Sequence, residues 1–221
     1  MTVHRTLYER VFEAYLRRLK LPYVAVEQAR RAMLPTGAKL SCTEPSSNST
    51  VRLKSFDFVV YGQRRNLLSE IKGRRLPARK PRKGQPAIGS SPPAARLESW
   101  TTLDDVESLA AWQTLFGPDF EAHLVFIYRL DRDADPSGFS EWFEHESTRY
   151  VVLGVPLDDY RAEMKTRSPR WRTVDLPTRA MERLARPLTI GADRLTDAHS
   201  ARSTLTADIQ PDQIADGLMP A

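Results

Sequence analysis

The chain has very few of the residues that build disulfides or histidine-rich metal sites. Cys42 is the single cysteine among 221 residues. Its isolation excludes an intrachain disulfide and a zinc site built from several cysteines. The histidines are scattered along the chain without the spacing of metal ligands, at His4, His123, His145 and His199.

Long hydrophobic runs are lacking as well. The longest clean apolar run, residues 124–128, is far shorter than the roughly 20 residues that a helix needs to span a bilayer. The N-terminus carries no hydrophobic segment typical of a secretory signal. We therefore expect a soluble, cytoplasmic protein with no membrane partner.

Basic residues are in excess over acidic ones. The chain has 33 Lys and Arg against 28 Asp and Glu, which gives a formal net charge of +5. Such a surface favours polyanions, above all nucleic acid, although many basic proteins bind none. Apolar residues make up 41% of the chain, which is enough for a hydrophobic core, and the length suits one globular domain.

The N-terminal segment has the pattern of an amphipathic helix. Its apolar residues recur at spacings of three and four, which predicts a helix over residues 6–20. Thr6 followed by Glu9 resembles a capping box, and Pro22 ends the helix because proline cannot continue it. For residues 23–26 the sequence then predicts a short buried strand.

The centre of the chain is rich in strand signals. Residues 35–50 are loop-like in composition. A hairpin is predicted from residues 55–61 and 67–72, joined by a turn. Six Arg or Lys before residue 84 and five Pro overall, with no acid until residue 98, predict a mobile basic loop over residues 73–97.

The rest of the chain alternates between helices and strands. The predicted helices cover residues 104–116, 157–164 and 178–184, and the predicted strands cover residues 123–128 and 149–153. Aromatic residues vanish after residue 190. We therefore expect one domain over residues 1–190 and a disordered tail over residues 191–221. This order of elements is typical of an α/β domain with a mixed sheet flanked by helices.

One group of charged residues stands out in the predicted hairpin. Glu70 and Lys72 are two residues apart on one strand, so their side chains point to the same face. Hairpin pairing would bring Asp57 of the preceding strand near Glu70. Mg²⁺ prefers oxygen ligands and is often held by one or two carboxylates with water and substrate phosphate. Asp57 and Glu70 could supply these ligands, and Lys72 could orient a water or stabilise charge on a phosphate.

This arrangement resembles the PD-(D/E)XK nuclease superfamily, which includes restriction endonucleases and archaeal Holliday junction resolvases. The resemblance implies a restriction endonuclease-like αβββαβ core, with Asp57 and Glu70 as metal ligands and Lys72 as the catalytic lysine. Residues 7–13 also resemble the motif of the uncharacterised HYExAFE family. Here Leu7 replaces the His of that motif, and Val11 replaces its Ala.

The superfamily resemblance implies further residues and partners. Glu9 and Glu13 lie on the helix where many members place another acidic metal ligand, and Glu9 is preferred because it lies nearer the helix start. Gln113 lies where some members place a supporting residue. The implied cofactor is Mg²⁺, with Mn²⁺ as a substitute. The implied substrate is nucleic acid, most often DNA, cut by an endonuclease or exonuclease, and related enzymes often form homodimers.

The basic run that follows Lys72 is a candidate for binding nucleic acid. Its position after the predicted catalytic lysine favours contacts with phosphates, and a solvated flexible loop is an equally good interpretation. Binding through such a run would weaken with salt because it releases counterions. The residues concerned are Arg74, Arg75, Arg79, Lys80, Arg82 and Lys83.

Each of these residues also has a purely structural interpretation. Glu70 and Lys72 could form an ion pair on a solvated strand face, Glu9 and Glu13 could be ordinary helix acids, and Gln113 could be structural. Asp57 favours function more strongly because it lies between two phenylalanines, where a buried charge is costly unless paired. Two alternative functions therefore stay open. The chain could be a catalytically inactive nucleic-acid-binding protein of the same fold, or an interaction protein whose basic tracts meet acidic surfaces.

Overall fold

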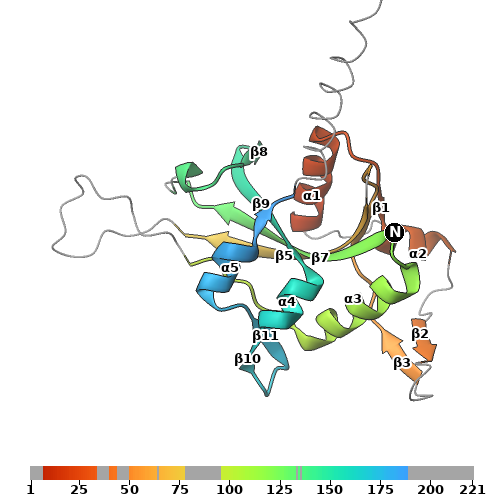
Figure 1. Cartoon of the computed structure of the whole chain (residues 1–221). Coiled ribbons are helices and arrows are strands. Elements are labelled where there is room, and N and C mark those ends of the chain that lie inside the picture. The colour runs from red at the N-terminus through yellow and green to blue at the C-terminus, as the bar shows by residue number, and fades with distance from the viewer. Residues whose placement is uncertain are drawn as a thin grey trace, which may run out of the picture.

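The computed structural model describes residues 7–33, 40–43, 50–63, 65–77, 96–132, 134 and 136–188. A twisted mixed sheet runs through the middle of the molecule (Figure 1). Its strands follow the spatial order β1-β4-β5-β7-β9-β12, and β8 pairs with β9 outside this path. The strands are β1 (Tyr23–Ala25), β4 (Phe58–Val60), β5 (Asn66–Leu76), β7 (Phe120–Leu130), β8 (Phe143–His145), β9 (Thr148–Pro156) and β12 (Arg186–Pro187).

The two longest strands form the only parallel pair among the described strands of this sheet. β5 and β7 are in register from Asn66 opposite Phe120 to Leu76 opposite Leu130. The other pairs of this sheet are antiparallel. β7 and β9 are nearly continuous apolar segments because both faces of the sheet are covered. The predicted mixed sheet is therefore confirmed.

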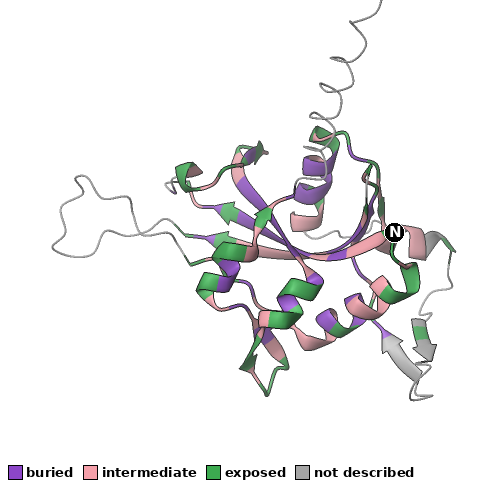
Figure 2. Ribbon diagram, in the orientation of Figure 1, coloured by how far each residue is buried: buried purple, intermediate pink, exposed green. Residues whose placement is uncertain are grey.

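Helix α1 (Leu7–Arg18) covers one face of the sheet (Figure 1). The middle of its apolar stripe is buried against residues of β4, β5 and β7, and Phe12 packs edge-on against Phe58 with ring centroids 5.2 Å apart. Figure 2 shows buried residues along the middle of α1 and exposed residues at the end from which the chain runs on to β1. The sequence pattern of spacings of three and four is thereby confirmed as the core-facing side of a helix.

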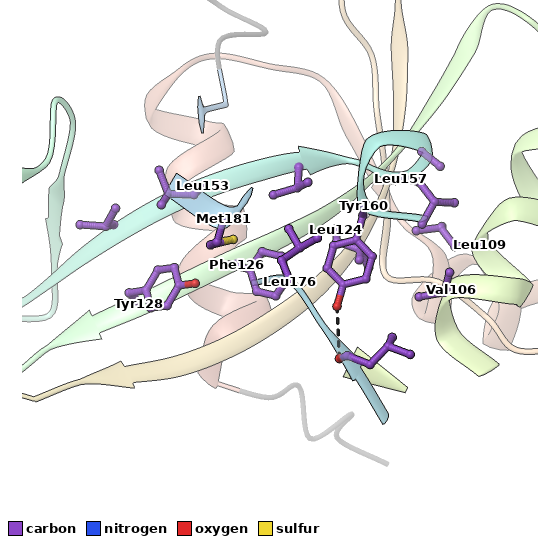
Figure 3. Packing of buried hydrophobic residues seen from close by; sticks show 14 of the residues in the cluster. Val106, Leu109, Leu124, Phe126, Tyr128, Leu153, Leu157, Tyr160, Leu176 and Met181 are labelled. Atoms are coloured by element: carbon purple, nitrogen blue, oxygen red, sulfur yellow. Dashed lines mark hydrogen bonds between the residues drawn. The ribbon is translucent and has the colours of Figure 1, made fainter. Parts of the chain in front are cut away.

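Three helices cover the opposite face: α3 (Leu103–Phe116), α4 (Leu157–Glu163) and α5 (Thr178–Leu184). Leu124 and Phe126 of β7 lie in the same buried cluster as Tyr160 of α4 and Met181 of α5 (Figure 3). Tyr160 is completely buried, and its hydroxyl donates to the carbonyl of Ser99 at 2.8 Å. The order α1, β1, β4, β5, α3, β7 follows the predicted αβββαβ core, with the other elements as insertions and additions.

The structure also contains elements that the sequence pattern did not predict. β10 (Lys165–Ser168) and β11 (Thr173–Asp175) form a hairpin that extends a second sheet in the order β10-β11-β6, with β6 at Thr101–Thr102. Figure 1 shows this hairpin projecting below α4 and α3. The others are α2 (Val26–Met33), β2 (Leu40–Thr43), β3 (Thr50–Leu53), the short helix η1 (Pro136–Gly138), and the strands β8 and β12.

Three boundaries correct the sequence analysis. The expected loop over residues 35–50 includes β2, which pairs with β3. The expected strand over residues 55–61 is only Phe58–Val60, so Asp57 lies in a bend just before it. The basic segment does not begin as a loop, because β7 provides a parallel partner that extends β5 to Leu76. Most of the remaining expected loop and the expected tail over residues 191–221 lie outside the described residues.

None of the helices in the described part of the chain is both long enough and apolar enough to cross a membrane.

Candidate active site

The centre of the candidate site is the α3-facing side of β5. Glu70 and Lys72 share this face, and the Lys72 Nζ atom lies 2.9 Å from Glu70 Oε1. The same ammonium lies 2.7 Å from Asp105 Oδ2 on α3. Only 15% of each of the Glu70 and Lys72 side chains is exposed. The prediction that Glu70 and Lys72 lie side by side is confirmed, and a second carboxylate contacts the same lysine.

Asp57 is held at the edge of β5 by hydrogen bonds. Its backbone N–H donates to the Ser69 carbonyl at 3.1 Å, and its Oδ2 accepts from the Ile71 N–H at 2.7 Å. Because β4 begins only at Phe58, Asp57 lies just before the strand, and its carboxylate rather than its backbone accepts from the Ile71 N–H. The Asp57 carbonyl accepts from the Val26 N–H at 2.9 Å. Hydrogen bonds to β5 on one side and to Val26 on the other therefore fix the orientation of Asp57.

The surroundings of Asp57 and Glu70 disfavour ionisation of both carboxyl groups. Burial, the charge of Glu70 and the charge of Glu9 raise the pKa of Asp57 to about 8, against the opposing effects of the Ile71 hydrogen bond and Lys72. Burial also raises the pKa of Glu70, although Lys72 opposes it. An additional cation near these carboxyl groups would relieve this repulsion.

Lys72 stays charged despite its burial. Burial by itself would lower the pKa of Lys72, but Glu70 and Asp105 together raise it above its usual value. Burial would likewise raise the pKa of Asp105, but Lys72 and Lys54 hold it well below its usual range. The site therefore presents an ammonium group whose position is fixed from two sides.

Asp105 is the site residue that the sequence analysis missed. It lies in the first turn of α3, where the Thr102 side chain caps the helix by accepting from the Asp105 N–H at 3.2 Å. Its Oδ2 also accepts from the Thr101 hydroxyl at 3.1 Å. The spacing of Thr102 and Asp105 is typical of a helix start and could have indicated Asp105 as a residue of the first turn. The sequence around Asp105 does not, however, indicate that it contacts Lys72.

Lys54 brings a second ammonium group to Asp105. It follows β3 directly, and its Nζ lies 2.8 Å from Asp105 Oδ1. Its backbone is tied to α3 at both ends, because the Lys54 N–H donates to Ser108 Oγ at 3.2 Å and its carbonyl accepts from Trp112 Nε1 at 2.7 Å. Asp105 thus orients two lysines, one half-exposed and one nearly buried.

The two predicted helix acids occupy different places on α1. Glu9 is near enough to Asp57 for its charge to raise the pKa of that residue. Glu13 is buried, and its Oε2 lies 3.8 Å from Arg17 Nη2. Electrostatically, Glu13 acts on Tyr23. Of the two acids, Glu9 is therefore the one associated with Asp57, in line with the preference stated from the sequence.

Gln113 lies away from the carboxylates. Its Oε1 accepts from the Ala122 N–H at 2.6 Å, and its Nε2 donates to Asp158 Oδ2 at 3.2 Å. It follows Asp105 by eight residues, which is about 12 Å along a helix. Gln113 joins α3 to the start of β7 and to α4, which matches its structural interpretation.

The predicted nucleic-acid-binding residues divide into two groups. Arg74 lies within β5 and stacks on Trp100, with its guanidinium carbon 4.1 Å from the ring centroid, and burial lowers its pKa. Arg75 is exposed and pairs with Asp131 at 2.7 Å. Both are therefore engaged within the protein, on a strand rather than a loop. The other four residues lie outside the described part of the chain: Arg79, Lys80, Arg82 and Lys83.

The donor set suits a divalent cation held partly by solvent and substrate. Within the described ranges, no three His, Cys, Asp or Glu side chains gather as a metal cluster, so Asp57, Glu70 and Glu9 do not form a complete site by themselves. Mg²⁺ commonly takes only one or two protein carboxylates. Asp57 and Glu70 match that requirement in chemistry and in their excess negative charge.

Comparison with known proteins does not assign the chain to a family. No family model and no curated protein match the chain, so the resemblance to the HYExAFE family stays a prediction. One solved structure that is similar is the Holliday junction resolvase Hjc of Archaeoglobus fulgidus. The two share 13% identity and a TM-score of 0.43, over 84% of this chain and 93% of the resolvase.

Proposed function

We propose that the protein is a metal-dependent nuclease of the PD-(D/E)XK type that hydrolyses phosphodiester bonds, with DNA as its expected substrate. One observation carries the proposal. Two largely buried carboxyl groups with raised pKa values, Asp57 and Glu70, adjoin a lysine that is kept charged. This combination of groups can bind a cation and a phosphate at one place.

Each residue has a role that follows from its position. Asp57 and Glu70 would hold Mg²⁺, or Mn²⁺ in its place, and the bound ion would polarise the phosphate and lower the pKa of a water. Lys72 would donate hydrogen bonds to the phosphate oxygen on which charge develops, or to the attacking water. Asp105 is a positioning residue, because it contacts Lys72 and, together with Glu70, holds its ammonium group in place.

The ion pairs of Lys72 also favour a second candidate function. A lysine that contacts both Glu70 and Asp105, without a three-ligand cluster in the described residues, fits a catalytically inactive nucleic-acid-binding protein. The two candidates differ in their response to metal. A binding protein retains its affinity in EDTA and yields no product, whereas a nuclease yields product only with a divalent cation.

A cleavage assay with matched variants separates the candidates. Purified protein is incubated with linear, supercoiled and branched DNA and with RNA, in Mg²⁺, Mn²⁺ or EDTA. The site variant is Glu70→Gln/Lys72→Met, and the control is Glu121→Gln, which alters a carboxylate paired with His123 and Arg65. We expect product with metal from the wild type and the control but none from the site variant. Cleavage that persists in EDTA or in the site variant would reject the proposed site.

A further inference from the structure

The second basic cluster of the sequence lies on the β10–β11 hairpin. Residues 165–175, here called the basic arm, carry Lys165, Arg167, Arg170 and Arg172 against a single acid, Asp175. That acid lies 3.7 Å from Arg96. Nearly all of the arm's side chains from residue 165 to residue 172 are exposed, so the arm presents positive charge to solvent.

A tryptophan occupies the tip of the arm. Trp171 is 68% exposed, which is unusual for a side chain that gains free energy from burial. The guanidinium carbon of Arg170 lies 5.2 Å from the centre of its ring. An exposed aromatic ring next to unburied arginines is the combination on which unpaired nucleic-acid bases stack while phosphates contact the cations.

The tip is anchored to the start of α3. Arg172 has a φ of 48°, in the left-handed region that non-glycine residues seldom adopt. Its carbonyl accepts from the Leu103 N–H at 2.7 Å, and its guanidinium lies 3.1 Å from Asp104 Oδ1 and 3.3 Å from Glu107 Oε2. Arg172 therefore holds the tip in place instead of offering its charge to a ligand. The neighbouring Trp171 ring is presented on a fixed turn.

This anchor places the arm beside the candidate active site. β11 pairs with β6, so that Thr173 lies opposite Thr102 and Val174 opposite Thr101. The same two threonines contact Asp105, whose carboxylate contacts Lys72. The segment Thr101–Thr102 thus lies between the basic arm and Asp105, which contacts the lysine that would bind the scissile phosphate.

We propose that the basic arm binds an unpaired stretch of the nucleic-acid substrate, with Trp171 stacking on a base and Lys165, Arg167 and Arg170 contacting phosphates. The inference rests on the proposed nuclease function for its substrate class. It narrows that class to nucleic acids with single-stranded segments next to the cleaved bond, such as overhangs, flaps and branch points. A fully paired blunt duplex offers phosphates but no base for Trp171.

The test measures binding in EDTA, so that it does not depend on cleavage. A labelled single-stranded oligonucleotide of about 12 nucleotides, within the usual site size, and a blunt duplex of the same length are titrated by fluorescence anisotropy. The variants are Trp171→Ala, Trp171→Phe and the control Trp142→Ala. Trp142 is also exposed, at 41%, but it lies between η1 and β8, outside the basic arm.

We expect Trp171→Ala to weaken single-strand binding about tenfold, the typical loss of one stacked base, and to leave duplex binding within twofold. Trp171→Phe should recover most of the loss, and Trp142→Ala should change neither ligand. Arg170→Ala should lower the salt dependence of binding by about one released counterion. Equal losses on both ligands would overturn stacking on a base, and no loss on either would overturn the arm as a binding element.

The design keeps this inference apart from the proposed function. A Lys72→Met variant that fails to cleave but keeps Trp171-dependent single-strand binding supports both. A wild type that never cleaves but shows the same binding supports the basic arm and rejects the nuclease. Cleavage by the wild type with binding indifferent to Trp171 rejects the arm alone.

Discussion

Two ionic clusters lie along the parallel β5–β7 pair, one at the middle of β5 and one at the start of β7, and their electrostatics are opposite. In the candidate active site, burial and the neighbouring carboxylates raise the pKa of Asp57 to about 8. At the start of β7, Glu121 lies 3.2 Å from His123 Nε2 and 3.0 Å from Arg65 Nη1. The hydrogen bond from His123, helped by Arg65, lowers the pKa of Glu121 to about 2.

The difference lies in the supply of cationic partners. Glu121 has the Arg65 guanidinium 3.0 Å away and the His123 ring 3.2 Å away, so its carboxylate is already well paired at the surface. Asp57, Glu70 and Asp105 share the ammonium groups of Lys72 and Lys54, which leaves one negative charge over when all are ionised. A cation from solution is therefore stabilising at the first cluster and superfluous at the second.

Replacing the cationic side chain of each cluster by methionine should produce the largest difference in catalytic rate. Lys72→Met keeps the aliphatic length but loses the group proposed to stabilise charge on the phosphate, and we expect a fall in kcat of about 10²–10³-fold. Arg65→Met should leave kcat unchanged. The measurement is single-turnover cleavage with Mg²⁺, with circular dichroism as a check of folding. Equal activity of Lys72→Met and wild type would exclude Lys72 from the chemistry.

Asp105→Asn should have a smaller effect of a distinctive kind. It removes a charge that raises the pKa of Lys72 but keeps an oxygen within reach of its ammonium. We expect kcat to fall about tenfold, in the lower range for one weakened charge-assisted contact. The basic limb of the pH–rate profile should also move to lower pH, because Lys72 loses its proton more easily.

The neighbouring residue provides the matched control for Asp105→Asn. Asp104 is next in the same helical turn, but its carboxylate contacts Arg172 rather than Lys72. Asp104→Asn should therefore leave the basic limb where the wild type has it. A shift of equal size in both variants would mean that the effect comes from the general charge of α3 and not from positioning of Lys72.

The contrast between Asp105 and Glu70 also shows where prediction from the sequence succeeds. Glu70 and Lys72 are two residues apart on a strand, and a strand fixes the relative direction of such neighbours by itself. Asp105 lies 33 residues beyond Lys72, so their contact depends on how α3 packs on the sheet. An acid in the first turn of a helix is common for local reasons, and this usual interpretation conceals its second role.

The fold shows the same limit. The short helix over residues 178–184 was predicted at its observed bounds, and the strand within β7 was evident from its continuous apolar run. In contrast, the end of β5 contains Arg74 and Arg75, which indicate a loop by composition. It forms a strand because β7 pairs with it residue by residue. Partners supplied by distant segments override local propensity here, as they often do in sheets.

The two clusters should give pH dependences of stability with opposite sign. Because the pKa of folded Asp57 is raised from 3.8 to about 8, the folded state holds a proton that the unfolded chain releases, and stability is lost as the pH rises through this window. Glu121 has a lowered pKa, from 4.5 to about 2, so its contribution is lost as the pH falls through that range.

Variants isolate these two contributions. Relative to the wild type in EDTA, Asp57→Asn should become more stable as the pH rises from 4 to 8, and Glu121→Gln should become more stable as the pH falls from 4.5 towards 2. Urea unfolding at a series of pH values measures both differences. Added Mg²⁺ should reduce the Asp57→Asn advantage at pH 8 alone. Parallel pH dependences in the two variants would contradict the contrast between the clusters.

The smallest effect on stability is expected from Arg65, the exposed partner of Glu121. Arg65 is largely exposed, at 68%, so its attraction to Glu121 is screened by water. Arg65→Ala should reduce the free energy of unfolding by less than about 1 kcal/mol, since His123 still contacts Glu121. Lys72→Ala should cost more, about 3 kcal/mol, because it leaves Glu70 and Asp105 poorly compensated in a buried place. Urea unfolding measures both losses. If Arg65→Ala and Lys72→Ala lost similar amounts of unfolding free energy, the carboxylates of the two clusters would depend equally on their cationic side chains, and the contrast would be wrong.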